Sequence, residues 1–324
     1  MAYFLVAVST RENLDLCIHH AQAGFTGSLT GVWAFLDIAV GDFLSFLYGA
    51  RIFNLYRLVG KRAIQDAHGA PPWAPIRFRS GLQYDFPFRL YLEPVRECQE
   101  SLVRAEFAYI AENLLLRGGY RKTQFQADQT TLQVVSQLGN ISQREPDPLD
   151  LSPYSSFEPS FVGLRSKQEV PRVFVFAEPI LHTLLRRYLE KQEHQRTLLL
   201  EMGISPGSLG ELEALGEKAL PEGHIDILLK EKTPIAQARQ IVIEVKKGIG
   251  RQADLEQLLR YKAICGPDCV GAGLVAAGFP SSVVRQAKEQ GVACASYRLE
   301  VPKPWDKPLP YIALERAFTL YLEG

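Results

Sequence analysis

Residues 223–247, GHIDILLKEKTPIAQARQIVIEVKK, decide the fold. Two runs rich in apolar and β-branched residues flank a polar turn, and this pattern predicts a β-hairpin. Three charges interrupt the runs: Asp226 lies in the first, and Glu244 and Lys246 lie in the second. Because IVIEV is apolar on both sides of Glu244, the second run predicts a central strand buried on both faces. An unpaired carboxylate there costs several kcal/mol, so we expect Glu244 to have a function.

Asp226, Glu244 and Lys246 have the residue types that a metal-dependent phosphodiesterase needs. Side chains alternate along a strand, so Glu244 and Lys246 share one face, and pairing of the two strands brings Asp226 to that face. Two carboxylates suit a hard divalent cation, Mg²⁺ or Mn²⁺. The cation activates a water, while a lysine positions the nucleophile or stabilises developing negative charge. The alternative is a solvated hairpin face, on which such charges need no function.

The motifs around this hairpin resemble the PD-(D/E)xK nucleases. GHIDILL and IVIEVKKG place Asp226, Glu244 and Lys246 on the motif positions, and in LEQLLRYK the residues Gln257 and Tyr261 match the QxxxY helix of one large branch. Further on, VGAGLVAAGFPSSVVRQAKEQGVACASYRLE resembles the closing strand, helix and strand of the NucS/EndoMS-type endonuclease domain. The resemblance implies a restriction-endonuclease-like core in which Asp226 and Glu244 hold the metal.

The first helix of that family often carries a further acidic residue. Glu178, which opens EPILHTLLRRYL, is the candidate here. The competing acids are Glu190, Glu193 and Glu201. The proline of the family name is absent from the position before Asp226. Three histidines in this half are predicted to be solvated: His182, His194 and His224.

The chain is predicted to divide into two domains of the α/β (α+β) class. Short aromatic and apolar alternations predict a small mixed β-barrel or sheet over residues 1–142, with a helix over Thr10–Gly24 and another over 100–119. Four prolines in QREPDPLDLSPYSSFEPSF predict a linker at 143–170. From Arg172 onward strands and helices alternate, which predicts an α/β nuclease domain over 171–324.

Two tryptophans and a basic segment indicate nucleic-acid binding in the first domain. Trp33 lies in TGVWAF and Trp73 in APPWAP, and residues 51–96 hold eight Arg or Lys against three acids. Basic side chains interleaved with aromatics are typical of a surface that follows phosphates and stacks a base, with Arg77 and Arg79 as phosphate contacts. Core packing is the alternative for each tryptophan, although the prolines and arginines around Trp73 make its burial harder.

The same region resembles the YTH branch of the PUA-like/EVE superfold. The resemblance rests on YFLVAVSTRENLDL, GVW, FNLYRLVG, PPW and YDFPFRLYLEPV. It implies that Trp33 and Trp73 clamp a flipped methylated base, usually N6-methyladenine, and that Ser9 and Asn13 read its edge. Stacking can offset the cost of flipping a base. The candidates for a third wall are Phe25, Tyr84 and Phe86.

Composition limits the remaining possibilities. The chain has 324 residues and a formal net charge of zero, so affinity for DNA has to come from local patches. MAYFLVAVS reads as a first strand and not as a signal peptide, and no apolar run is long enough to span a membrane. The five scattered cysteines indicate reduced thiols in the cytoplasm.

The sequence thus predicts a modification-dependent DNA endonuclease that uses Mg²⁺ or Mn²⁺, in prokaryotic defence. The first domain reads a methylated base in duplex DNA and the second domain cuts nearby. Cutting both strands needs two active sites, so a homodimer is expected. Two alternatives remain: a mismatch- or structure-specific endonuclease of NucS/EndoMS type, and an RNA-binding module with a non-catalytic nuclease-like scaffold.

Overall fold

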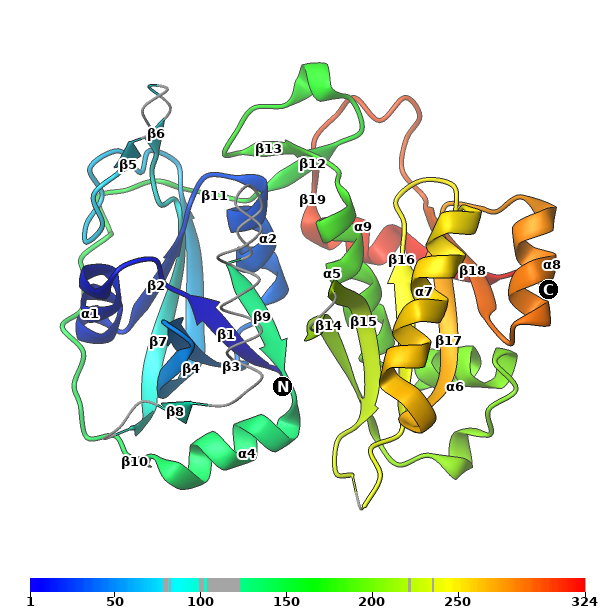
Figure 1. The fold of residues 1–324 in the computed structure, drawn as a ribbon. Coiled ribbons are helices and arrows are strands. Elements are labelled where there is room, and N and C mark those ends of the chain that lie inside the picture. The colour runs from blue at the N-terminus through cyan, green and yellow to red at the C-terminus, as the bar shows by residue number, and fades with distance from the viewer. Residues whose placement is uncertain are drawn as a thin grey trace. The chain divides into compact units, whose positions relative to one another are not determined.

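The chain forms two units, each with its own sheet and core (Figure 1). The structure, a computed structural model, describes residues 1–77, 81, 83–98, 102–103, 123–220, 223–234 and 236–323. The first unit comprises residues 1–127, 131–175 and 306–310, and the second comprises 128–130, 176–305 and 311–324. Both units mix helices with mixed sheets, which confirms the predicted fold class. None of the described helices is long and apolar enough to cross a membrane.

The first unit is built on a nine-stranded sheet whose main path runs β10-β7-β4-β3-β1-β9. β1 and β3 are parallel, while β4 pairs antiparallel with β3 and β7. Off this path, β2 pairs with β7, and β8 and β11 pair with β4. Over the described residues no pairing joins the end strands β9 and β10, so the sheet is open and not the closed barrel that the sequence suggested. The strands are β1 (Tyr3–Ala7), β2 (Gln22–Phe25), β3 (Phe43–Tyr48), β4 (Arg51–Ile64), β7 (Phe88–Glu97), β8 (Leu102–Val103), β9 (Gln124–Ala127), β10 (Asn140–Ile141) and β11 (Ser156–Phe157).

Helix boundaries in this unit follow from caps. Helix α1 (Arg11–His20) begins after Thr10, whose Oγ1 accepts a hydrogen bond from the Asn13 N–H at 3.1 Å. It ends at Ala21, which has a left-handed φ of 45°, and so it is shorter than the predicted Thr10–Gly24 helix. Helix α2 (Leu29–Asp37), which is capped by Ser28, was not predicted from the sequence. Its apolar residues are buried nearly all round the helix, so they lack the one-sided period that marks a surface helix.

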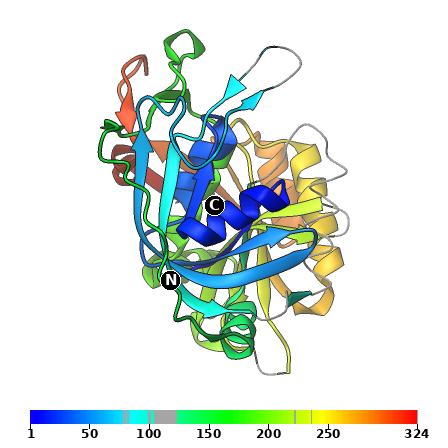
Figure 2. The same ribbon diagram turned by 90° about the vertical axis from the view of Figure 1, so that its left-hand side faces the viewer.

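Figure 2 shows the same structure turned by 90°. A two-stranded ribbon of β5 (Ile76–Arg77) and β6 (Gln83–Tyr84) projects from the body of the unit in both views. A small third sheet joins β12 (Ser160–Val162), β13 (Val173–Val175) and β19 (Leu309–Pro310).

Two sequence predictions for the middle of the chain need correction. Residues 143–170 are not a free linker, because β11 pairs with β4 and because Leu151 and Phe161 are buried in the first unit. The predicted helix at 100–119 falls mostly outside the described residues, and its described part, Leu102–Val103, is strand β8. Residues Gln129–Leu138 form helix α4.

The second unit is a six-stranded sheet in the order β14-β15-β16-β17-β18-β20. β14, β15 and β16 are antiparallel, β16, β17 and β18 are parallel, and β20 closes the sheet antiparallel to β18. Its strands are β14 (Leu212–Leu220), β15 (Gly223–Glu231), β16 (Gln240–Val245), β17 (Cys269–Ala276), β18 (Ala293–Leu299) and β20 (Phe318–Leu322). Its helices are α5 (Glu178–Leu189), α6 (Gln192–Glu201), α7 (Gln252–Cys265), α8 (Ser281–Glu289) and α9 (Tyr311–Ala317).

The hairpin that decides the fold is β15 and β16, as predicted. β16 lies between β15 and β17 and is buried along its length, which confirms a central strand. Helices α7 and α8 connect the parallel strands, and Leu255 and Leu258 of α7 pack into the core below them. Strand β13, in contrast, was expected to open the second domain but pairs within the first unit. Its apolar alternation predicts a strand but says nothing about the sheet it joins.

Candidate active site

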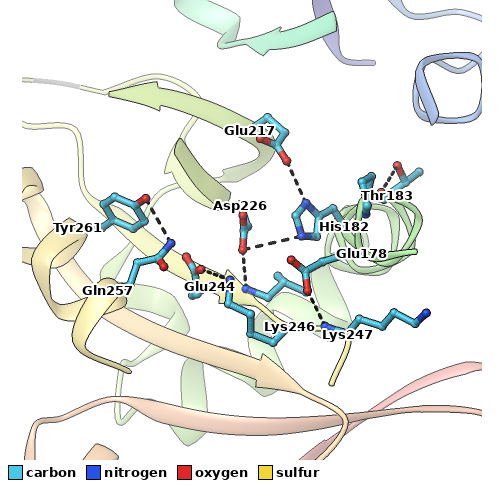
Figure 3. Close-up of polar contacts among 12 residues, drawn as sticks. Glu178, His182, Thr183, Glu217, Asp226, Glu244, Lys246, Lys247, Gln257 and Tyr261 are labelled. Carbon is cyan, nitrogen blue, oxygen red and sulfur yellow. Dashed lines mark hydrogen bonds and ion pairs between the residues drawn. The ribbon is translucent and has the colours of Figure 1, made fainter. Parts of the chain in front are cut away.

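Strands β15 and β16 separate at the end where the predicted catalytic residues lie. Their backbone pairing runs from Lys230↔Gln240 to Ile227↔Ile243 and then stops. Beyond that point the Asp226 side chain replaces the backbone pairing, because its Oδ2 accepts a hydrogen bond from the Val245 N–H at 2.8 Å. Asp226 is thereby held beside the end of β16, where Glu244 and Lys246 lie (Figure 3).

Glu244 is the most deeply buried charge in this group. It is 0% exposed, and its Oε1 accepts a hydrogen bond from Lys246 Nζ at 2.6 Å. Its Oε2 is buried and has no hydrogen-bond partner among the described residues. Burial, reinforced by the negative charge of Asp226, raises the pKa of Glu244 well above its ordinary range. Burial therefore makes the ionised form of the Glu244 carboxylate costly.

Lys246 shares a face with Glu244, as strand alternation predicted. Burial lowers the pKa of Lys246, but its hydrogen bond to Glu244 and the charges of Glu244, Asp226 and Glu178 outweigh this effect, so the pKa of Lys246 is raised. The ammonium is therefore cationic at any physiological pH. Its side chain is 23% exposed, so it can reach a substrate from its position beside Glu244.

Glu178 is the acid that the structure brings to this site from the first helix. It is the first residue of α5, and its Oε2 accepts a hydrogen bond from the Lys247 N–H at 2.8 Å. Among its competitors, Glu190 lies at the opposite end of the same helix and pairs with Arg186. Glu193 and Glu201 lie on α6.

Gln257 and Tyr261 project from α7 toward the same group of residues (Figure 3). Gln257 Nε2 donates a hydrogen bond to the Tyr261 hydroxyl at 3.3 Å. Burial and the charges of Glu244 and Asp226 raise the pKa of Tyr261. A Cβ atom at Gly223 would lie 2.6 Å from the Tyr261 hydroxyl, so glycine at the start of β15 is what lets α7 approach this closely.

Two residues of this site were missed or misread from the sequence. His182 on α5 was predicted to be solvated, but it is 7% exposed and its Nδ1 lies 3.0 Å from Glu217 Oε1. Its Nε2 lies 3.8 Å from Asp226 Oδ2. Glu217, on β14, is 6% exposed. No local sequence pattern indicated either residue. Strand β14 was not predicted, and the polar neighbours of His182 suggested a solvated side chain.

The other two histidines also differ from the prediction. His224, two residues before Asp226 on β15, is 8% exposed, because this end of the hairpin lies in the protein interior. His194 stacks on Tyr188 with ring centroids 3.6 Å apart. The sequence context did not mark the burial of His224, because a charged hairpin has the same pattern whether its face is solvated or covered.

The donor set fits a divalent cation. A buried carboxylate with an unpartnered oxygen, Glu244, lies beside a second carboxylate, Asp226, whose charge helps to raise its pKa. A cation between them would remove this repulsion and satisfy the unpartnered oxygen. Carboxylate oxygens are the ligands that Mg²⁺ and Mn²⁺ accept.

The predicted base-reading residues of the first unit lie in different surroundings. Trp33, inside α2, is 3% exposed, and Trp73 is 5% exposed. The expectation that Trp73 resists burial is therefore wrong. Gly24 makes room for its indole, because a Cβ there would lie 2.5 Å from the ring. Of the candidate third walls, Phe86 packs against Trp73 with ring centroids 5.7 Å apart.

The remaining predicted readers lie near the surface or outside the described residues. Ser9 is exposed, and the N–H of Asn13 is used in the cap of α1. Arg77 is exposed on β5, whereas Arg79 is not among the described residues. Phe25 is buried on β2, and Tyr84 is half-buried on β6.

Much of the basic segment serves the fold. Lys61 donates to the carbonyls of Phe35 and Ile38 at the end of α2, and Arg62 donates to those of Leu151 and Tyr154. Arg89 is 0% exposed and its guanidinium lies 4.5 Å from the centre of the Trp73 ring. Burial lowers the pKa of Arg89 to about 10. Its Nε and Nη1 have no hydrogen-bond partner among the described residues.

Comparisons with known proteins show weak structural likeness. No protein-family model matches the chain, and no curated protein matches it. Among solved structures, a Pseudomonas putida protein from a structural genomics consortium is 18% identical, with a TM-score of 0.28, over 42% of this chain and 99% of its own. The DNA modification-dependent restriction endonuclease AspBHI is 11% identical, with a TM-score of 0.19, over 78% of this chain and 61% of its own.

Proposed function

We propose that this protein is a metal-dependent DNA endonuclease whose second unit hydrolyses phosphodiester bonds. The observation that carries the proposal is the group formed by Asp226, Glu244 and Lys246, with Glu178 beside it. Two carboxylates, one buried with an unpartnered oxygen, lie beside the part-buried ammonium of Lys246 at the end of a central strand. A buried oxygen without a hydrogen-bond partner costs about 1–3 kcal/mol. A purely structural ion pair has no use for such an oxygen, whereas a metal site does.

Each residue of the group has a defined role in this proposal. Asp226 and Glu244 would hold Mg²⁺ or Mn²⁺, which when bound lowers the pKa of a water and offsets phosphate charge. Lys246 stays cationic and donates to the attacking oxygen or to the phosphate. Glu178, fixed by the Lys247 N–H, borders the site from α5. Gln257 borders it from α7, where its amide donates a hydrogen bond to the Tyr261 hydroxyl.

We further propose that the first unit selects a modified base in duplex DNA, with N6-methyladenine favoured. The resemblance to YTH domains suggests the base, and one contact supports a ligand near Trp73. Two nitrogen atoms of Arg89, Nε and Nη1, have no hydrogen-bond partner among the described residues, and its guanidinium lies over this indole. Phe86 packs against the same indole. An aromatic face with adjacent donors is the chemistry that holds a flipped base. Trp33 is enclosed within α2 and serves as a comparator for Trp73.

A substrate panel tests both parts. The full-length protein is incubated with Mg²⁺ or Mn²⁺ and with plain, N6-methyladenine-containing, mismatched and single-stranded DNA, and with RNA. Cleavage of methylated duplex alone supports the whole proposal. Cleavage of mismatched duplex without a need for methylation would leave the nuclease and replace its target. Binding of RNA without any cleavage would reduce the second unit to a scaffold.

Oligomeric state belongs to the same proposal. One Asp226–Glu244 site cuts one strand, so double-strand cleavage requires two copies of the chain on the DNA. Sedimentation of the protein with and without methylated duplex measures this directly. Double-strand breaks produced by a complex with a single chain would contradict a homodimer.

A further inference from the structure

A buried carboxylate, Glu217, and a part-buried one, Asp226, lie opposite each other on strands β14 and β15. The register pairs Gly216 with Ile227 and Lys218 with Ile225, which places Glu217 directly opposite Asp226. Glu217 has a left-handed φ of 56°, a conformation that residues other than glycine rarely adopt. Like charges directly opposite each other destabilise a sheet. This pair therefore needs a positive charge between its members.

His182 lies between the two carboxylates (Figure 3). Its Nδ1 is 3.0 Å from Glu217 Oε1, which is a hydrogen bond, whereas its Nε2 is 3.8 Å from Asp226 Oδ2, which is too long for one. One ligand atom from each of these three residues lies within 4.8 Å of the others. The imidazole is thus bound on one side by Glu217 and directed on its other side toward Asp226.

The hydrogen bond to Glu217 determines what His182 can offer. A carboxylate accepts, so Nδ1 carries the proton in the neutral ring and Nε2 carries the lone pair. Histidines that bind metals have this arrangement, in which a carboxylate fixes the tautomer and the ring orientation. Two atoms that each lie about 2.1 Å from one cation are at most about 4.2 Å apart. The separation of Nε2 and Asp226 Oδ2 is compatible with a shared cation.

A second observation, outside this trio, points to a cation at the same place. Glu244 is fully buried, and its Oε2 has no hydrogen-bond partner among the described residues. Asp226 therefore borders Glu244 on one side and His182 on the other.

We propose that His182 is a nitrogen ligand of the catalytic cation, that Glu217 positions it, and that the site consequently prefers Mn²⁺ to Mg²⁺. The inference rests on the proposed nuclease function, because it uses the same Asp226 site. Magnesium selects oxygen ligands, whereas imidazole suits transition metals. Glu217 is a positioning residue here, since it acts on the metal only through His182.

Electron spin echo spectroscopy of Mn²⁺ added alone to the full-length protein tests this inference. The expected result is a nitrogen coupling to bound Mn²⁺ in the wild type, which is lost in His182→Asn. Glu217→Gln should keep the nitrogen ligand but weaken Mn²⁺ binding about 10- to 100-fold. Mg²⁺ affinity should change less than Mn²⁺ affinity in both variants, so the ratio of Mn²⁺ affinity to Mg²⁺ affinity should fall.

Controls separate this site from others. His19, His20 and Asp147 form an exposed group that could hold an ion, so a His19→Gln/His20→Gln variant has to retain the nitrogen coupling. Circular dichroism establishes that each variant is folded, and Glu217→Gln provides an independent reading if His182→Asn is not. A nitrogen coupling that persists in His182→Asn, or that disappears in the His19/His20 variant, would overturn the inference.

The outcomes also distinguish the two proposals. Mn²⁺ that binds in an Asp226-dependent manner without nitrogen coupling would overturn the role of His182 and leave the nuclease intact. Absence of any divalent-cation binding that depends on Asp226 would overturn both.

Discussion

The two units treat their conspicuous residues in opposite ways. In the second unit, three charges that interrupt apolar strands converge on one site, and a further carboxylate and a histidine join them. In the first unit, the conspicuous tryptophans are buried, and Lys61 and Arg62 bind backbone carbonyls.

The difference reflects the cost of burial. A core absorbs an aromatic ring with a gain of free energy, so a tryptophan in a sequence is compatible with either packing or binding. A carboxylate in a central strand is costly unless something compensates it. Charges inside apolar runs therefore locate sites more reliably than aromatics do, and the following predictions test that contrast.

The largest effect is expected from the catalytic group. Asp226→Ala, Glu244→Ala and Lys246→Ala should each lower the cleavage rate by at least about 10³-fold, equivalent to about 4 kcal/mol of transition-state stabilisation. DNA affinity should stay within about threefold of the wild type, because phosphate contacts dominate it. Gel-based cleavage assays and fluorescence anisotropy measure the two quantities.

Glu211→Ala provides the matched control for these variants. Glu211 is an exposed carboxylate of the same unit, paired with Lys232. It should change neither cleavage nor binding. Metal-dependent cleavage that survives in Glu244→Ala would show that the buried charge has no chemical role. The contrast between functional charges in the second unit and packed aromatics in the first would then fail.

How far the sequence could predict this site depends on how local each signal is. Asp226, Glu244 and Lys246 were visible because strand alternation and the apolar run around Glu244 are properties of adjacent residues. Glu217 was not visible, because its position opposite Asp226 depends on the register of β14, which no adjacent residue determines.

The fold shows the same limit. The hairpin, the central position of β16 and the division into two α/β units followed from periodicity. Periodicity did not show which unit residues 143–170 and β13 belong to. That depends on pairing with β4 and β12, which are other segments of the chain. The prolines there indicated irregular backbone, and they could not indicate that Leu151 would be buried.

The second largest effect concerns the tryptophans. Trp33→Ala and Trp73→Ala should each lower the free energy of unfolding by about 3–5 kcal/mol, because both rings are buried. If Trp73 also reads a base, its loss should weaken binding of methylated DNA by about 1–3 kcal/mol, or about 5- to 150-fold. Trp33→Ala should not affect methylated DNA selectively.

Thermal melts and paired affinities for methylated and plain duplex decide this point. Equal losses on both DNAs in both variants would assign Trp73 to the core alone. A loss of affinity for methylated DNA alone, seen only in Trp73→Ala, would show that Trp73 contributes to a base-binding site although its ring is buried.

An intermediate effect is expected from pH in the metal-free protein. In the unfolded chain Glu244 titrates near its ordinary value of 4.5, whereas in the folded chain its pKa is raised. The folded state thus binds more protons, so the free energy of unfolding should fall as pH rises from about 4.5 to 8. The loss should be about 2–4 kcal/mol.

Glu244→Gln should remove most of this pH dependence, because the amide cannot ionise. Denaturant titrations of both proteins at several pH values, with a chelator present, measure it. A slope that is unchanged in Glu244→Gln would show that other groups dominate. Added Mn²⁺ should restore the stability of the wild type at pH 8 and have less effect on the variant.

The smallest effect compares two arginines of the first unit that differ in what they contact. Arg77 is exposed on β5, so Arg77→Ala should weaken binding of methylated and plain DNA equally, by about 3- to 10-fold, and lower the salt dependence by about one phosphate contact. Arg62 donates to the backbone carbonyls of Leu151 and Tyr154, so Arg62→Ala should instead lower the melting temperature. Its salt dependence of binding should stay that of the wild type. Anisotropy titrations across salt concentrations and thermal melts give both quantities for both variants. If Arg62→Ala altered the salt dependence and Arg77→Ala altered only stability, the assignment would be reversed. DNA would then contact a different part of the basic segment from the one that the structure indicates.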